Sequence, residues 1–150
     1  MSENSATKTF RNNWASEGAH PQRIEDKITP GIPDTNICWL GLEAWFEGKF
    51  LRKLPARDDT LVQFGSKGEP RLRHQRNWLT TRAKAGGSAF WWVRVQDTCW
   101  FMCDHNFDWL KDGVRKDLFL AQHEYMFSDS KAMIKWAQGV MLDNQRRRVM

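Results

Sequence analysis

The chain lacks the features of an exported or membrane-embedded protein. No apolar run in its 150 residues reaches the roughly 18 residues that cross a bilayer. The first residues, Met-Ser-Glu-Asn-Ser, are polar and lack the apolar segment of a signal peptide. Cysteine is scarce and odd in number, at Cys38, Cys99 and Cys103, so we expect reduced thiols. These absences favour a cytoplasmic protein, and the length suits one domain with its own core.

The motifs of several common sites are missing as well. The sequence has no glycine-rich phosphate loop and no nucleophile elbow. Its cysteines and His105 lack the paired Cys-x-x-Cys spacing of zinc knuckles. We therefore interpret the strand cysteines as core residues rather than metal ligands.

Basic residues and tryptophan are abundant instead. The net charge is +5 and the pI is near 9.3, which suits a polyanionic partner without naming one. Most of the nine tryptophans are expected in the core, because large aromatic side chains carry much of the burial in a small domain. The alternative for some of them is stacking on unpaired bases.

The stretch 30–49 predicts a β-hairpin. A short apolar run is broken by Leu40-Gly41, and two strands joined by a tight glycine-containing turn are typical of this pattern. Side chains alternate between the faces of a strand, so Glu47 and Lys49 are expected to point the same way. Asp34 opens the first strand directly after a proline that restricts the backbone.

This hairpin would bring Asp34, Glu47 and Lys49 together at one end of a sheet. Hard carboxylate oxygens hold Mg²⁺, and a neighbouring cation steers or activates water. The arrangement therefore favours metal-dependent phosphodiester hydrolysis. The alternatives are a turn aspartate and an ordinary surface ion pair. A third acid, Glu25 or Asp26, is close to Asp34 in the sequence.

The order of the remaining elements predicts an α/β fold, with a mixed sheet flanked by helices. The expected elements are helices at 5–18, 71–85 and 130–142, a short strand at 60–64, strands at 88–95 and 99–103, and further helical structure from residue 108. We expect a single domain, with a core at 23–105, a helical C-terminal part at 108–143 and a mobile basic tail at 144–150 that contains Arg146, Arg147 and Arg148.

The expected helix 71–85 has one polar residue on its apolar stripe. Gln75 shares that stripe with Leu72 and Leu79, and a buried amide needs hydrogen-bond partners. Gln75 therefore either satisfies backbone groups of the sheet or faces the carboxylate site. The basic residues of this helix are Arg71, Arg73, Arg76, Arg82 and Lys84. They either bind the phosphates of a nucleic acid or form a solvated basic face.

With these residues in view, the sequence resembles the PD-(D/E)xK nucleases, which have the restriction-endonuclease-like fold. It is most similar to the small phage enzymes of the VRR-NUC type, several of which are regarded as Holliday junction resolvases. The resemblance covers roughly residues 23 to 95. It rests on Arg23-Ile24-Glu25, Pro30-Gly31-Ile32-Pro33-Asp34, Trp45-Phe46-Glu47-Gly48-Lys49, Gln75 with Trp78, and Ala85-Gly86-Gly87 before an apolar strand.

The resemblance implies a metal-dependent DNA endonuclease. Asp34 and Glu47 would bind Mg²⁺ or Mn²⁺ together with the backbone carbonyl of Gly48. Branched or Holliday-junction DNA would be the substrate, and a homodimer would supply the two sites that cut a junction symmetrically. If the chain is phage-encoded, it would act in the cytoplasm of the host cell.

The resemblance also implies roles for the neighbouring residues. Lys49 would orient or activate water, Glu25 would support a metal or its waters, and Gln75 would contact a bound water or phosphate. The basic helix 71–85 would supply affinity for the DNA backbone.

One position departs from the family pattern. A bulky apolar residue is usual between the glutamate and the lysine, whereas this chain has Gly48. Glycine weakens a strand and can admit a bulge, which would swing Lys49 off the face of Glu47. The alternatives are therefore a catalytically degenerate, DNA-binding or virion protein of the nuclease fold, and a single-strand-binding module.

Overall fold

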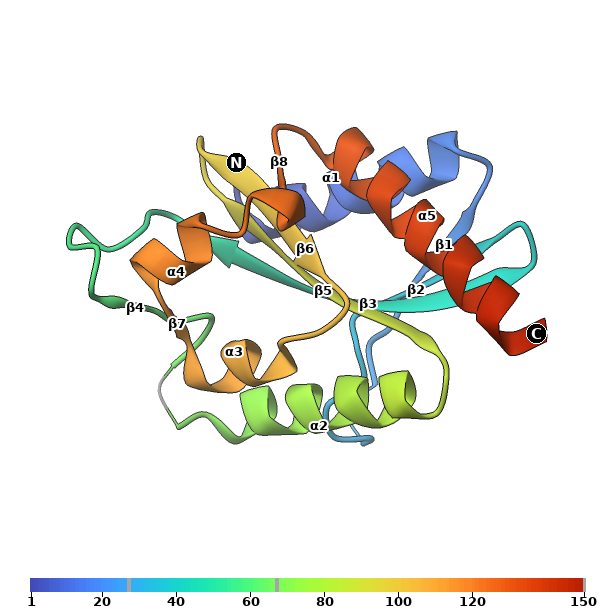
Figure 1. Ribbon diagram of the computed structural model, residues 1–150, viewed down its shortest axis with the longest axis horizontal. Coiled ribbons are helices and arrows are strands. Elements are labelled where there is room, and N and C mark those ends of the chain that lie inside the picture. Colours follow the sequence, from blue (N-terminus) through green and yellow to red (C-terminus); the bar gives the residue numbers. More distant parts are fainter. Residues whose placement is uncertain (27, 67, 150) are drawn as a thin grey trace.

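The chain folds as a mixed β-sheet between two layers of helices (Figure 1). The computed structural model describes residues 1–26, 28–66 and 68–149. Up to the sixth strand the elements are α1 (Glu3–Ser16), β1 (His20–Arg23), β2 (Thr35–Trp39), β3 (Leu42–Leu51), β4 (Leu61–Val62), α2 (Pro70–Lys84), β5 (Ser88–Val95) and β6 (Cys99–Cys103). They are followed by α3 (Phe107–Asp112), β7 (Val114–Arg115), α4 (Lys116–Leu120), the 3₁₀-helix η1 (His123–Tyr125), β8 (Met126–Phe127) and α5 (Ser130–Val149).

Within the described residues the main sheet has six strands, in the order β1-β2-β3-β5-β6-β8. β3 and β5 run parallel, and the other neighbouring strands are antiparallel. β4 and β7 form a separate small antiparallel pair. The α/β class with a mixed sheet flanked by helices is therefore confirmed.

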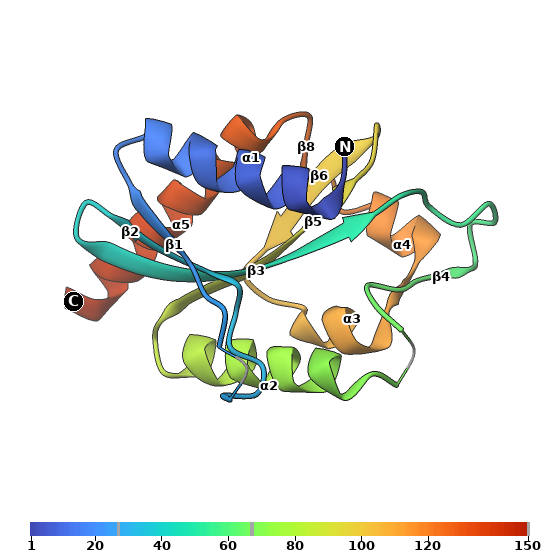
Figure 2. The same ribbon diagram turned by 180° about the vertical axis from the view of Figure 1, so that it is seen from behind.

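The two faces of the sheet are covered by different helices. α1 and α5 lie over one face, and α2 and α3 lie over the other (Figures 1 and 2). The first face packs Phe10 and Trp14 of α1 against Phe46 and Trp92, whereas the second packs Leu79 of α2 close to Trp91. Alternation along β3 and β5 thus sends successive side chains into two separate cores.

The expected N-terminal helix and hairpin are confirmed. In α1 the Ser2 hydroxyl caps the N–H of Ser5, and Ala6, Phe10 and Trp14 form its buried stripe. The hairpin pairs β2 with β3, and the pair Trp39–Leu42 closes the two-residue turn. Both turn residues, Leu40 and Gly41, have positive φ, as the twist of a tight hairpin requires.

The elements that follow also lie where the sequence predicts them. α2 begins at Pro70 and buries Leu72, Gln75 and Leu79. β5 and β6 have the expected bounds. The expected strand at 60–64 is limited to the two residues of β4.

The C-terminal end differs from the prediction. The expected helix 130–142 continues to Val149, so the described part of the segment 144–150 is helical rather than a mobile tail. Asn144 donates a 3.0 Å hydrogen bond to the Ser88 hydroxyl, which joins this end of α5 to the start of β5. Met150 lies outside the described residues.

Within the described ranges, no helix has the length and apolar character needed to cross a membrane.

Candidate active site

Asp34 lies where the β1–β2 connection enters β2, beside the edge of β3. The Asp34 Oδ2 atom accepts the backbone N–H of Gly48 at 3.0 Å, and Oδ1 accepts the Thr35 hydroxyl at 2.9 Å. The Asp34 carbonyl accepts the N–H of Ile24 at 2.8 Å. The backbone and the side chain of Asp34 are therefore both fixed, and the carboxylate faces the strand that carries Glu47 and Lys49.

Glu47 and Lys49 point to the same side of the sheet, as the hairpin predicts. Their exposed fractions are only 4% and 8%, and Lys49 Nζ lies 3.5 Å from Glu47 Oε2. Gln75 of α2 is 7% exposed, and its Oε1 accepts a 2.8 Å hydrogen bond from Lys49 Nζ. Of the two alternatives for Gln75, the structure shows the one in which it faces the carboxylate site.

β3 has no bulge at Gly48, the position where glycine could admit one. β3 stays in continuous register with β5, with Gly48 opposite Trp92 and Lys49 opposite Val93. A Cβ at position 48 would overlap the indole ring of Trp92. Glycine is therefore present because the neighbouring ring fills the space, and Lys49 remains on the face of Glu47.

Burial governs the electrostatics of the two acids. Desolvation, with the Asp34 carboxylate adding to it, raises the pKa of Glu47 to about 8, although Lys49 and Arg71 oppose the shift. Desolvation also raises the pKa of Asp34, against the hydrogen bonds from Gly48 and Thr35. The buried Glu47 carboxyl and the half-buried Asp34 carboxyl beside it thus favour either a shared proton or a bound cation.

An open pocket of about 410 Å³ contains this constellation. Glu25, Asp26 and Arg71 line it together with the buried residues. The Glu25 carboxylate is exposed and pairs with Arg23 at 2.6 Å, whereas Asp26 Oδ1 accepts the backbone N–H groups of Ile28 and Thr29. The structure thus brings Glu25 to the rim of the pocket and not into the buried pair.

The donor set fits a hard divalent cation. Asp34 and Glu47 offer carboxylate oxygens. The N–H and C=O of a strand residue point to the same edge, so the Gly48 carbonyl faces the side of Asp34. Among the described residues no three Asp, Glu, His or Cys groups converge as metal ligands. Two carboxylates and a carbonyl suit Mg²⁺, which retains waters or takes phosphate oxygens for its remaining positions.

The basic residues expected to bind DNA lie in different surroundings. Arg71 lines the site pocket and lies 3.2 Å from Glu69. Arg76 pairs with Asp108 at 2.7 Å, and the Arg82 guanidinium lies over the rings of Trp45 and Trp78. Arg73 and Lys84 are exposed.

Sequence reasoning missed two neighbours of the buried acids. Thr35 donates to Asp34, and this contact follows from its position after Asp34 at the strand start. Arg11 of α1 acts on the charge of Asp34, yet α1 lies far away in the sequence and the spacing carries no signal of this proximity. Arg71 was expected only as a DNA contact, but it also lines the site.

The cysteines behave as expected. Cys38, Cys99 and Cys103 are free thiols. Burial raises the pKa of the Cys103 thiol, and its sulfur lies 2.8 Å from the carbonyl of His105. Cys103 is therefore a core residue and not a reactive one.

Comparisons with known proteins give two structural likenesses at low identity. No family model matches the chain, and no curated protein matches it. A Holliday junction resolvase, Hjc, from the archaeon Archaeoglobus fulgidus is 15% identical, with a TM-score of 0.46 over 65% of this chain and 72% of that chain. A structure described as a VRR_NUC domain is 16% identical, with a TM-score of 0.44 over 81% of this chain and 96% of that chain.

Proposed function

We propose that this protein is a metal-dependent DNA endonuclease. One observation carries the proposal: Lys49 lies 3.5 Å from the Glu47 carboxylate and 2.8 Å from the Gln75 amide, all three side chains being buried in the pocket that Asp34 borders. Burial of ionisable groups is unfavourable unless hydrogen bonds or opposite charges compensate it. A buried group of ionisable side chains, kept in spite of this cost, favours a catalytic role over a role in stabilising the fold.

Asp34, Glu47 and the Gly48 carbonyl would hold Mg²⁺ or Mn²⁺. The bound cation would supply Lewis acidity at the phosphate and lower the pKa of a water. Glu25, at the rim of the pocket, would reach this centre through water. The raised pKa of Glu47 means that cation binding would displace a proton from this carboxyl.

Lys49 would orient the attacking water and stabilise charge on the phosphate. Its ammonium has three donors. One is directed to Gln75 and another faces Glu47, so the third is available to water or to a phosphate oxygen. Gln75 would thus act first as a positioning residue for Lys49, beyond the contact with water or phosphate that the resemblance implies.

In the proposed reaction a water oxygen bonds to phosphorus as the bond from phosphorus to the 3′ oxygen breaks. The 3′ oxygen takes up a proton to become a 3′-hydroxyl, and the other strand end keeps a 5′-phosphate. Arg71 at the pocket and the exposed Arg73 and Lys84 would bind backbone phosphates, with the salt dependence of counterion release. Arg76 and Arg82 would add to this surface, Arg76 beside its partner Asp108 and Arg82 from its place over the Trp78 ring.

Branched DNA, of which the Holliday junction is one case, is the proposed substrate, as for the phage enzymes that the sequence resembles. A homodimer would place two sites on one junction. Gly48 is the feature that favours the degenerate-nuclease alternative; the continuous register of β3, which keeps Lys49 on the face of Glu47, supports the active nuclease.

The test compares a labelled four-way junction with a linear duplex of the same sequence, each incubated with Mg²⁺ or with EDTA. Paired nicks on the junction in Mg²⁺ alone, with 5′-phosphate ends, are the expected result. Cutting of both substrates at equal rates would support the nuclease proposal and contradict the preference for junctions. Binding without cutting, in Mn²⁺ as in Mg²⁺, would replace the proposal with a DNA-binding protein of the nuclease fold.

A further inference from the structure

A second groove on α2 lies outside the pocket of the candidate active site, although its Arg82 belongs to the basic residues proposed to bind DNA. Its volume is about 340 Å³. Its α2 residues recur at intervals of three and four, so they share one face of the helix. The residues that line it include Pro30, His74, Asn77, Trp78, Thr81 and Arg82.

This groove and the candidate active site share a wall. The segment between β1 and β2 descends from the sheet onto α2 (Figure 2). Within it, Gly31 lies so close to the backbone of His74 that a Cβ would overlap it. Pro30 lines the groove and Ile32 lines the site pocket, as Gln75 does. The groove and the site pocket are therefore neighbours, separated by the contact of Gly31 with α2.

The groove has an aromatic and cationic wall. The rings of Trp45 and Trp78 have centroids 5.1 Å apart, and the Arg82 guanidinium lies 4.6 Å from the Trp78 centroid. Both tryptophans are half-buried, and Trp78 also packs against the core on the α2 side of the sheet. No carboxylate in the described ranges pairs with Arg82. Trp45 is two residues before Glu47, on the same face of β3.

Planar side chains of this kind bind nucleobases by stacking. Base–aromatic stacking tolerates any base, since each base has a π-face, and arginine adds a cation–π contact. The Asn77 amide and the Thr81 hydroxyl, on the same groove, provide hydrogen-bond donors and acceptors for the edge of a base.

We propose that this groove binds an unpaired nucleobase next to the scissile phosphate, stacked on Trp78 and Arg82. The inference rests on the proposed nuclease function and specifies its substrate class. A base in a continuous duplex must first be unpaired and unstacked to enter the groove, whereas a base on a single-stranded arm or unpaired at a branch point does not have that cost. The groove thus selects DNA with unpaired nucleotides.

The test measures binding in EDTA, so that cleavage does not interfere. The probes are a labelled blunt duplex and the same duplex carrying a single-stranded arm. Wild type is expected to prefer the armed duplex, and Trp78→Leu to lose roughly tenfold in affinity for it while the blunt duplex is unaffected. Trp39→Leu is the matched control, because Trp39 is also half-buried but packs against Trp14 on the opposite side of the sheet.

Arg82→Gln is the second variant, since loss of Trp78 also removes a packing partner of Trp45. It keeps the ring pair and is expected to reduce the preference for the armed duplex in part. Equal affinity of wild type for the two probes, or an unchanged preference in both variants, would overturn the inference. Cleavage by wild type in Mg²⁺ is measured separately, and its absence would overturn the nuclease proposal whatever the binding preference.

Discussion

Gly48 and Trp92 face each other across the parallel strands β3 and β5, and the Trp92 ring fills the space that a Cβ at position 48 would need. On the opposite side of β3, the side chains of Glu47 and Lys49 flank this glycine. The strand that carries Glu47 and Lys49 therefore has no room for a side chain at position 48.

Gly48→Ala is expected to destabilise the protein by about 1–3 kcal/mol, because the added methyl group overpacks the core against Trp92. The strand must also shift, so activity is expected to fall with it. Denaturant unfolding measures the loss, and Trp92→Leu in the same chain should recover part of it. Gly139→Ala is the control: this exposed position in α5 has open space for a Cβ and should gain about 0.5–1 kcal/mol. Equal stability of Gly48→Ala and wild type would contradict the explanation.

The stability of the metal-free protein should fall as the pH rises. The pKa of Glu47 rises from 4.5 to about 8 on folding, so the folded state binds more protons between these values and the free energy of unfolding decreases with pH. Each unit of pKa difference is worth about 1.4 kcal/mol. Unfolding of wild type and Glu47→Gln in EDTA, from about pH 5 to about pH 8, measures the effect.

Glu47→Gln should flatten this pH dependence, and Glu43→Gln, which changes an exposed acid of the same strand, should not. Asp34→Asn is a poorer variant, because both Asp34 oxygens accept hydrogen bonds and an amide can replace only one acceptor. A wild-type profile that rises between about pH 5 and about pH 8 would count against a buried, protonated Glu47.

Mg²⁺ and Mn²⁺ should stabilise the folded protein in proportion to the logarithm of their concentration, once the site is near saturation. The gain in Tm should be larger near pH 8 than near pH 6, because the cation competes with the proton on Glu47. Thermal unfolding with and without the cation checks this. Glu47→Gln should abolish the gain, and an equal gain in that variant would place the cation elsewhere.

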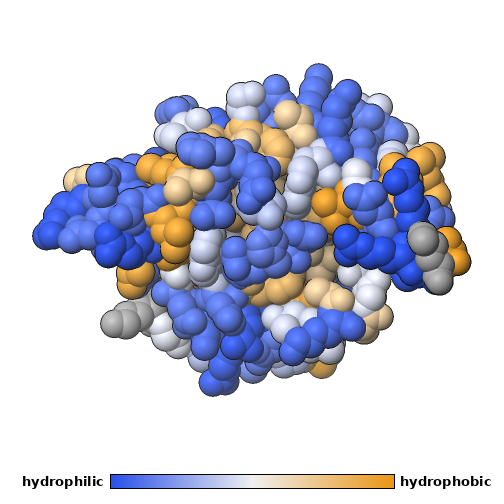
Figure 3. Space-filling view, in the orientation of Figure 1, coloured by the Kyte–Doolittle hydropathy of each residue, from blue (hydrophilic) through white to orange (hydrophobic). Residues whose placement is uncertain are grey.

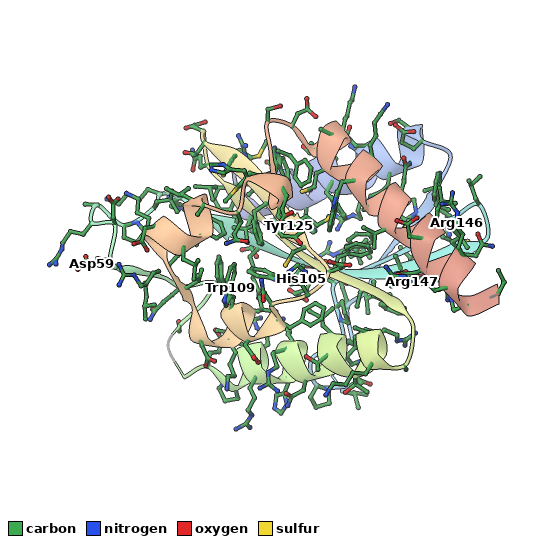
Figure 4. The ribbon with its side chains drawn as sticks, viewed as in Figure 1. Asp59, His105, Trp109, Tyr125, Arg146 and Arg147 are labelled. Carbon is green, nitrogen blue, oxygen red and sulfur yellow. The ribbon has the colours of Figure 1, made fainter. Side chains whose placement is uncertain are left out.

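The C-terminal end of α5 is expected to contribute to DNA binding. Arg146 and Arg147 lie on this end (Figure 4), and hydrophilic side chains gather over it in the space-filling view (Figure 3). Asn144 ties it to Ser88, directly after the connection from α2. Substitution of Arg147 by Gln should weaken binding to any DNA and reduce the salt slope by about one.

Arg57→Gln serves as the control for that measurement. Arg57 pairs with Asp59 at 2.9 Å, and Asp59 lies at the other end of the molecule from Arg147 in Figure 4. An identical loss of affinity in both variants would indicate a general charge effect instead of a defined contact.

The hairpin and the position of Gln75 could be predicted because the information is local. Two-residue periodicity and a glycine-containing turn placed Glu47 and Lys49 on one face. Helical spacing placed Gln75 on the buried stripe of α2, although which partner it meets depended on the packing of α2 on the sheet.

The other features of the site and of the C-terminal segment could not be predicted, because they depend on contacts between segments that are distant in the sequence. The need for glycine at position 48 becomes clear only when β5 is known to lie beside β3 in parallel register, because this register places Trp92 opposite Gly48. The charge of Arg11 in α1 acts on Asp34, although the two residues are far apart in the sequence. Glu25 lies at the rim of the pocket, where it pairs with Arg23. The expected basic tail is helical because the chain continues through Asn144, which is anchored to Ser88.

The most direct test of the catalytic constellation is the single-turnover rate of junction cleavage in Mg²⁺ by wild type, Lys49→Met and Lys53→Met. Lys53 is an exposed lysine just beyond β3, so it matches the change in charge without touching Glu47 or Gln75. The account predicts a loss of about 10²- to 10⁴-fold for Lys49→Met and a rate near wild type for Lys53→Met. Cleavage by a folded Lys49→Met protein at the wild-type rate would contradict it.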